Sequence, residues 1–154
     1  MATLKAQLKD DLTVATKARD AVTLGTLRMA LTAITNKEVS GKEARELSDD
    51  EVIGVLTSEA KKRRESIEAY TAANRPDLAE IEAAELTVLE KYLPAALSAE
   101  ELADLVANAV AEAKASGLEG MKAMGAVMKT LQPSVNGRAD GGAVAAAVKA
   151  ALGA

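Results

Sequence analysis

Apolar residues recur at every third or fourth position along almost the whole chain. Near its start, Leu4, Leu8, Leu12 and Ala15 fall on one face of a helix predicted over residues 3–19. No segment shows the strict apolar–polar alternation of a half-buried strand, and no tight turn is flanked by β-branched runs. The pattern therefore predicts an all-α protein.

Three more helices are predicted in the first part of the chain, each with its own N-terminal signal. Asp20 is an N-cap candidate for the second helix. Ser48 opens a capping box for the third, with acidic residues in the first turn. Pro76 stands at the first helical position of the fourth. Residues 37–47 are expected to form a polar connection between the second and third helices.

The third predicted helix is long and ends near residue 73. At 1.5 Å per residue it would span about 35 Å, so the N-terminal part of the chain is expected to be elongated. Its expected buried positions are Val52, Leu56, Ala60, Ile67 and Tyr70.

A domain boundary is predicted after Pro94. The segment Tyr92-Leu93-Pro94 ends the fourth helix, and Ser98 then opens a second capping box. The predicted domains are residues 1–94, with about four helices, and residues 95–154. The smaller domain is expected to contain three short helices, over 99–115, 121–131 and 141–152, with a helix stop at Pro133.

Composition removes most catalytic chemistries. Hydrophobic residues make up 49% of the chain but aromatic residues only 1%, so the core must consist of aliphatic side chains. The chain has no Cys and no His, which excludes thiolate chemistry, the commonest general base and the commonest transition-metal ligand. No phosphate-binding or dinucleotide-binding glycine motif is present. We therefore predict no cofactor, no metal and no catalysis by this chain alone.

The same data bear on location and partners. The first residues lack the basic and apolar regions of a signal peptide, and no apolar run reaches the roughly twenty residues that span a bilayer. A cytoplasmic protein without membrane association is expected. The net charge of −4 argues against a dedicated nucleic-acid binder but leaves room for a local basic patch.

The loop Gly137-Arg138-Ala139-Asp140-Gly141 is the first candidate for a function beyond packing. A glycine-flanked arginine beside a helix N-terminus can meet a phosphate with its guanidinium and with backbone N–H groups. The alternative is structural: Asp140 caps the last helix, Gly137 and Gly141 permit the turn, and Arg138 is solvated.

A basic cluster, Lys61-Lys62-Arg63-Arg64, lies within the third predicted helix. Lys61 and Arg64, with Arg28 and Lys37, could contact phosphates. The alternative is a solvated face, because Glu59–Arg63, Lys61–Glu65 and Arg64–Glu68 have the spacing of helical ion pairs. Arg75 is a further binding candidate beside Pro76.

Two apolar features have alternative roles. The face that contains Met121, Met124 and Met128 is typical of a core, although methionine also suits an exposed partner surface. The segment Tyr92-Leu93-Pro94 is either a docking element between domains or a helix end covered by an amphipathic ring.

Taken in order, several short segments match one family. They are Leu27-Arg28, Asn36-Lys37-Glu38, residues 61–70 (KKRRESIEAY), Asn74 to Ala79, Glu82, Glu85, Tyr92-Leu93-Pro94, Met124 to Met128, Pro133 and Gly137 to Gly141. The chain resembles the YqeY family over essentially its whole length. The C-terminal part of that family is similar to the tail domain of the B subunit of the tRNA-dependent amidotransferase.

The resemblance implies a helical domain followed by a three-helix tail domain. In the amidotransferase the tail helps to hold the tRNA, so Arg138 and its glycine loop become candidates for an RNA backbone contact. Ala123 departs from the acidic residue usual in the family. The label of carbon–nitrogen ligase with glutamine as amide donor would describe the shared tail, because the catalytic part of the amidotransferase has no counterpart here.

Two functional hypotheses follow from these residues. The first is a non-catalytic accessory that binds tRNA or a tRNA-handling enzyme. The second is a protein–protein adaptor without nucleic-acid binding, favoured by the acidic net charge, the methionine face and the lack of stacking aromatics.

Overall fold

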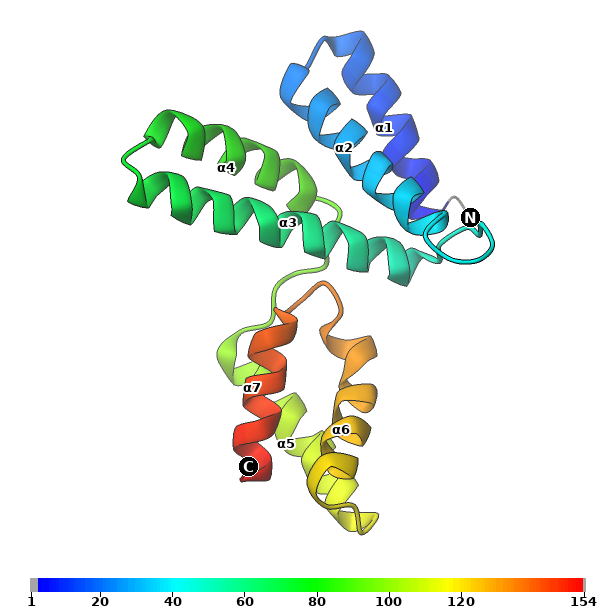
Figure 1. The fold of residues 1–154 in the computed structure, drawn as a ribbon, viewed down its shortest axis with the longest axis vertical. Helices are drawn as coiled ribbons and strands as arrows, with labels where there is room; N and C mark the ends of the chain where they lie inside the picture. The colour runs from blue at the N-terminus through cyan, green and yellow to red at the C-terminus, as the bar shows by residue number, and fades with distance from the viewer. Residues whose placement is uncertain (1–2, 154) are drawn as a thin grey trace. The chain divides into compact units, whose positions relative to one another are not determined.

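The computed structural model describes residues 3–153, which form seven α-helices and contain no strand (Figure 1). The prediction of an all-α protein is confirmed. The helices are α1 Leu4–Ala18, α2 Ala21–Glu38, α3 Asp49–Ala72, α4 Pro76–Glu90, α5 Ala99–Ala115, α6 Gly120–Val135 and α7 Gly141–Leu152.

Most helix starts follow from local side-chain chemistry. Asp20 and Asp140 each accept a hydrogen bond from the backbone N–H three residues on, at the starts of α2 and α7. Ser48 and Ser98 form complete capping boxes with Glu51 and Glu101. These caps satisfy backbone N–H groups that have no partner within the helix, so the sequence alone sets where these helices begin.

Contacts divide the chain into two compact units, one up to Leu93 and one from Pro94, here called the N-terminal unit and the C-terminal unit. In the N-terminal unit, α1 packs against α2, and α3 packs against α4 and α2. Its core consists of aliphatic residues, which are Leu8, Leu27, Ala30, Ile34, Leu47, Val52, Leu56, Ala60, Val88 and Leu89.

The connection between α2 and α3 is less polar than expected. Leu47 is buried in the core, and Glu38 at the end of α2 is also buried. The Nζ atom of Lys5 donates to both carboxylate oxygens of Glu38, at 2.8 and 2.7 Å, and the Leu47 N–H donates to Oε1 at 3.4 Å. A buried carboxylate with these partners anchors the connection to α1.

The far end of α3 is more exposed than predicted. Ile67 and Tyr70 are half-buried, whereas Val52, Leu56 and Ala60 are buried as expected. In Figure 1, α4 lies along this C-terminal part of α3, so the part is covered mainly on one side.

Pro133 does not stop α6, contrary to the prediction. The helix continues to Val135 and contains Pro133 in its last turn. Proline there removes one intrahelical N–H donor, so the last turn of α6 stays helical with one backbone hydrogen bond fewer. The helix ends before Asn136, whose backbone is no longer helical (φ −58°, ψ 121°). Gly137 completes the turn in a left-handed conformation (φ 72°), which glycine adopts without a steric penalty.

The C-terminal unit is a three-helix unit with its own small core. Its buried residues are Val106, Ala109, Val110, Ala113, Val127, Leu131, Val135, Val144 and Val148. The predicted methionine face is divided: Met124 and Met128 pack against this core, while the side chain of Met121 is 86% exposed.

Candidate nucleic-acid interface

The loop between α6 and α7 is held in place by the segment that precedes α5. The Arg138 Nε atom donates to the carbonyl oxygen of Ala95 at 2.9 Å, and the Leu97 N–H donates to the carbonyl oxygen of Arg138 at 2.8 Å. Arg138 is half-buried. Because an arginine has five N–H donors, the contact with Ala95 fixes the guanidinium and leaves donors for another ligand.

The N-terminus of α7 has its own anion. The Asp140 carboxylate accepts from the Ala143 N–H at 3.0 Å, and a Cβ atom at position 142 would lie 3.0 Å from the same carboxylate oxygen. Gly142 therefore leaves room for the Asp140 cap. The capping role that the structural interpretation gives to Asp140 is confirmed. Gly141 begins the helix, and a Cβ atom there would meet nothing within 4 Å. Because this carboxylate already faces the first turn of α7, the Arg138 side chain is the stronger candidate for a phosphate contact at this loop.

The electrostatic influence of Arg138 extends to α5. The pKa of the Glu101 carboxyl lies below its ordinary value of 4.5, mainly because the Ser98 backbone N–H donates to it. The charge of Arg138 contributes to the same shift, so the guanidinium lies close enough to affect the start of α5.

One exposed face of α6 carries two lysines with a glycine between them. Lys122 and Lys129 are both exposed and lie seven residues apart, close to two helical turns, so they share a face. Gly125 lies between them, and a Cβ atom on it would meet nothing within 4 Å. We call Lys122, Gly125 and Lys129 the α6 face.

Charge is segregated between the helices of the C-terminal unit. From residue 120 to residue 152 the basic residues are Lys122, Lys129, Arg138 and Lys149, and the acidic residue is Asp140. From residue 98 to residue 119 the acidic residues are Glu100, Glu101, Asp104, Glu112 and Glu119, and the basic residue is Lys114. A unit with little net charge thus concentrates its positive charge on α6 and α7, where it can form a local basic patch.

The other candidate cations lie in the N-terminal unit. Lys61 and Arg64 are exposed on α3, and Arg28 is exposed on α2. Arg64 donates to Glu90 on α4 at 3.4 Å, not to the expected Glu68. Arg75 forms a two-pronged hydrogen bond with Asp77, at 3.0 and 2.9 Å, which offsets its charge.

Arg63, the third member of the basic cluster, has a structural role. Its side chain is 5% exposed and donates to Glu59 and to Glu85, both at 3.2 Å. The predicted Glu59–Arg63 pair is confirmed. The cluster is therefore not a continuous basic surface, because its third member points into the N-terminal unit.

Sequence reasoning singled out Arg138 but missed Lys122 and Lys129. Their seven-residue spacing, with no acidic residue from position 120 to position 139, was the available signal. The structure brings Gly137, Arg138 and Gly141 together at the C-terminal end of α6. The candidates Lys61, Arg64, Arg28 and Arg75 belong to the other unit.

Among the described residues there is neither a metal-binding cluster nor a membrane-spanning helix. No three acidic side chains gather there in a group that could hold a metal ion. None of the helices in residues 3–153 has both the length and the apolar character that are needed to cross a bilayer.

A comparison with known families decides the wider assignment. The sequence profile of the family described as Yqey-like protein matches residues 5–152. The chain belongs to the YqeY-like family. This match includes both units and therefore the α6 face, the loop at Arg138 and the basic cluster of α3.

Fungal relatives of this YqeY-like chain carry the name "Altered inheritance of mitochondria protein 41, mitochondrial". The relative from Kluyveromyces lactis is 35% identical over 114 residues, which cover 72% of this chain and 60% of the relative. The relative from Clavispora lusitaniae is 32% identical over 131 residues, which cover 83% of this chain and 74% of the relative. The one from Meyerozyma guilliermondii is 35% identical over 96 residues, which cover 60% of this chain and 49% of the relative. The chain thus spans about half of the length of the first relatives it matches.

Proposed function

We propose that this YqeY-like protein is a non-catalytic accessory that binds tRNA through its C-terminal unit. The observation that carries the proposal is the basic character of the segment from α6 to α7, which contains the α6 face and an arginine, Arg138, held by the carbonyl oxygen of Ala95. The resemblance of this unit to the tail of the amidotransferase B subunit supports the same ligand. The cytoplasmic location remains a prediction, and the names of the fungal relatives place those proteins in mitochondria.

The physical argument concerns the phosphate backbone of RNA. Lysine offers a mobile point charge, whereas arginine offers a planar fork that matches a phosphate. Gly125 places no side chain between Lys122 and Lys129, so a phosphate chain can approach the helix closely. Without Trp or Phe, and with both tyrosines in the N-terminal unit, contact by base stacking is not expected in the C-terminal unit.

The same argument favours binding without strong sequence preference. Contacts to phosphate position a nucleic acid but do not read its bases. We therefore expect the chain to recognise the shape of a folded RNA backbone, and any choice among tRNAs to come from a further partner.

The test is the binding of labelled total tRNA to the whole protein in a salt series, measured by fluorescence anisotropy. Binding should weaken as salt rises. The Lys122→Gln/Lys129→Gln variant should lose about tenfold in affinity at low salt, and its salt slope should fall by about two, one for each lost cation. Both side chains are exposed, so this variant should fold normally.

A charge-matched control separates the α6 face from a general electrostatic effect. Lys17→Gln/Lys42→Gln removes two exposed cations from the N-terminal unit and should keep the affinity for tRNA within about twofold. Arg138→Gln tests the loop and should also weaken tRNA binding. Because this change removes the contact with Ala95, circular dichroism must show that the variant is folded. Equal losses in the two double variants, or no binding of tRNA to folded protein at low salt, would refute the proposal.

A further inference from the structure

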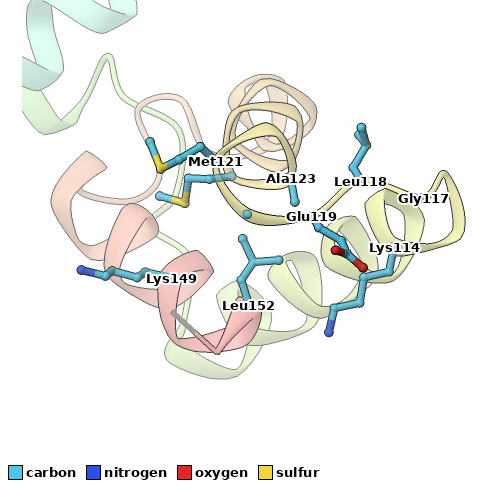
Figure 2. Close-up of a pocket in the computed structure, with 10 residues that line it drawn as sticks. Lys114, Gly117, Leu118, Glu119, Met121, Ala123, Lys149 and Leu152 are labelled. Carbon is cyan, nitrogen blue, oxygen red and sulfur yellow. The ribbon is translucent and has the colours of Figure 1, made fainter.

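An apolar pocket lies at the end of the C-terminal unit where α5 ends, α6 begins and α7 ends (Figure 2). It has a volume of about 890 Å³. Its apolar lining comes from Leu118, Met121, Ala123, Met124 and Leu152. In Figure 2, Leu152 extends from α7 toward the start of α6.

The pocket is a wide surface depression and not an enclosed cavity. Ala123 is buried at its base, but Met121 on its wall is 86% exposed, and Gly117 and Gly120 are also exposed. A small apolar ligand gains affinity when a site encloses most of its surface. A wide, open depression is instead suited to bind several apolar side chains that project from one face of a partner helix.

Charge around the pocket indicates the character of that partner. Lys114 and Lys149 line the pocket, and Figure 2 shows them at opposite ends with Leu152 between them. Glu119 is the one carboxylate in the lining, so two ammonium groups face a single negative charge. The surroundings favour a ligand that is apolar in the middle and acidic at its margins.

From this arrangement we propose that the pocket docks an acidic amphipathic helix of a partner protein. Apolar side chains at positions i, i+4 and i+7 of that helix enter the pocket between Leu118, Met121 and Leu152. Its flanking carboxylates face Lys114 and Lys149. The flexible thioethers of Met121 and Met124 adapt to the shape of these side chains.

This inference goes beyond tRNA binding and uses a different surface. The proposed RNA contacts are Lys122, Lys129 and Arg138, none of which lines the pocket. The protein would then carry an RNA-binding face and a protein-docking pocket on the same three helices, and so join an RNA to a second protein.

The experiment uses a synthetic, fluorescently labelled amphipathic helix of about five turns, with leucines on one face and glutamates beside them. Two control peptides replace the leucines with alanine or the glutamates with lysine. Anisotropy with the whole protein should give a dissociation constant on the order of 10 μM for the acidic peptide and at least tenfold weaker binding for both controls.

Three protein variants place the binding in the pocket. Met121→Asp should abolish binding of the acidic peptide, and its exposed position makes a folding defect unexpected. Lys114→Glu/Lys149→Glu should reverse the preference, so that the lysine peptide binds more tightly than the acidic one. Lys122→Gln/Lys129→Gln should bind the peptide normally while its affinity for tRNA falls about tenfold, so the two proposals can fail separately.

Methionine methyl NMR gives an independent readout. The acidic peptide should shift the methyl signals of Met121 and Met124 and leave that of Met29, in the N-terminal unit, unchanged. Equal binding of acidic and basic peptides, or no shift at Met121 at millimolar peptide, would overturn the proposal. Tighter binding of dodecanoate than of the peptide, or self-association that Met121→Asp abolishes, would also overturn it, because the occupant would then be a fatty acid or a second copy of the chain.

Discussion

Arg63 on α3 and Glu85 on α4 form an ion pair inside the N-terminal unit, with 3.2 Å between Nε and Oε2. The same guanidinium also donates to Glu59, and its Nη2 lies 3.8 Å from the sulfur of Met29 on α2. One side chain thus connects three helices. Arg63 is buried and Glu85 is half-buried. Such a pair is costly to break, because removal of the arginine leaves the charge of Glu85 without its partner in a partly desolvated place.

We expect Arg63→Met to destabilise the N-terminal unit by about 3 kcal/mol, since Glu85 would lose its cation and Glu59 would keep only Lys62, at 2.7 Å. Arg64→Met, one residue further on, should cost less than about 1 kcal/mol, because both members of the Arg64–Glu90 pair are half-exposed. Urea unfolding followed by tyrosine fluorescence measures this unit specifically, as both tyrosines lie in it. Similar costs for the two variants would contradict the assigned role of Arg63.

Acid should weaken the connection between α2 and α3 through Glu38. The hydrogen bond from Lys5 holds the pKa of this carboxyl below its ordinary value of 4.5 and outweighs the opposite effect of burial. The stabilisation from Glu38 is therefore complete above that value, and it is lost as the pH falls through the lower pKa of the folded state.

The matching experiment compares thermal unfolding of the wild type and of Glu38→Gln from about pH 6 to about pH 3. The wild type should lose its advantage over Glu38→Gln across the acid end of this range. Glu46→Gln, at an exposed position in the same connection, should follow the wild type. A constant difference between the wild type and Glu38→Gln at every pH would show that Glu38 does not titrate as inferred.

Alkali should weaken the N-terminal unit through Tyr92. Its hydroxyl donates to Asp11 Oδ2 at 2.6 Å, and burial together with this hydrogen bond raises the pKa of Tyr92 above its ordinary value of 10.0. The neutral form is thus favoured in the folded state, so this stabilisation is complete below pH 10.0 and declines as the pH rises further.

Tyr92→Phe should cost about 1 kcal/mol near neutral pH, where it removes a single hydrogen bond. That difference from the wild type should shrink above about pH 10, because the wild type alone then loses the contribution of Tyr92. Urea unfolding followed by circular dichroism, once near neutral pH and once above about pH 10, measures the difference in stability between the wild type and Tyr92→Phe under each condition. A difference that grows with pH would reverse the inferred direction of the pKa shift.

Substitutions at Gly125 should affect the stability of the C-terminal unit and its affinity for tRNA in different ways. In mid-helix, Gly125→Ala should stabilise the C-terminal unit by about 0.5–1 kcal/mol, since the added methyl group meets nothing in the protein. Gly125→Leu should keep the helix and reduce tRNA affinity several-fold by occupying the space between Lys122 and Lys129.

Gly25 provides the matched control for that prediction. It also lies within an exposed part of a helix, α2, where a Cβ atom would meet nothing within 4 Å. Gly25→Ala and Gly25→Leu should leave tRNA affinity unchanged. If Gly125→Leu also binds tRNA like the wild type, the α6 face is not the contact surface.

Local sequence predicted the ends of most helices but not all of them. Ser48, Ser98 and Asp140 act within three residues of themselves, so their capping could be inferred without tertiary structure. Pro133 misled the prediction because its effect depends on its place in the helix, and α6 ends at Val135, about one turn beyond the expected limit near Leu131.

The candidate site was only partly accessible from sequence. Arg138 was found because glycines mark its loop, but its anchoring by Ala95 joins positions 43 residues apart and has no local signal. The basic cluster of α3 misled for a related reason. Four consecutive cations look alike in sequence, and only the packing of α3 against α2 and α4 buries Arg63.

The sequence by itself determined the helical class, the main helix starts and the family, because these depend on periodicity, caps and the order of short motifs. The tertiary structure decided which charged and apolar residues are exposed, because burial depends on neighbours distant along the chain. It therefore distinguished Arg63 from Arg64 and exposed Met121 from packed Met124. It also formed the pocket from the ends of three helices, which no local pattern could reveal.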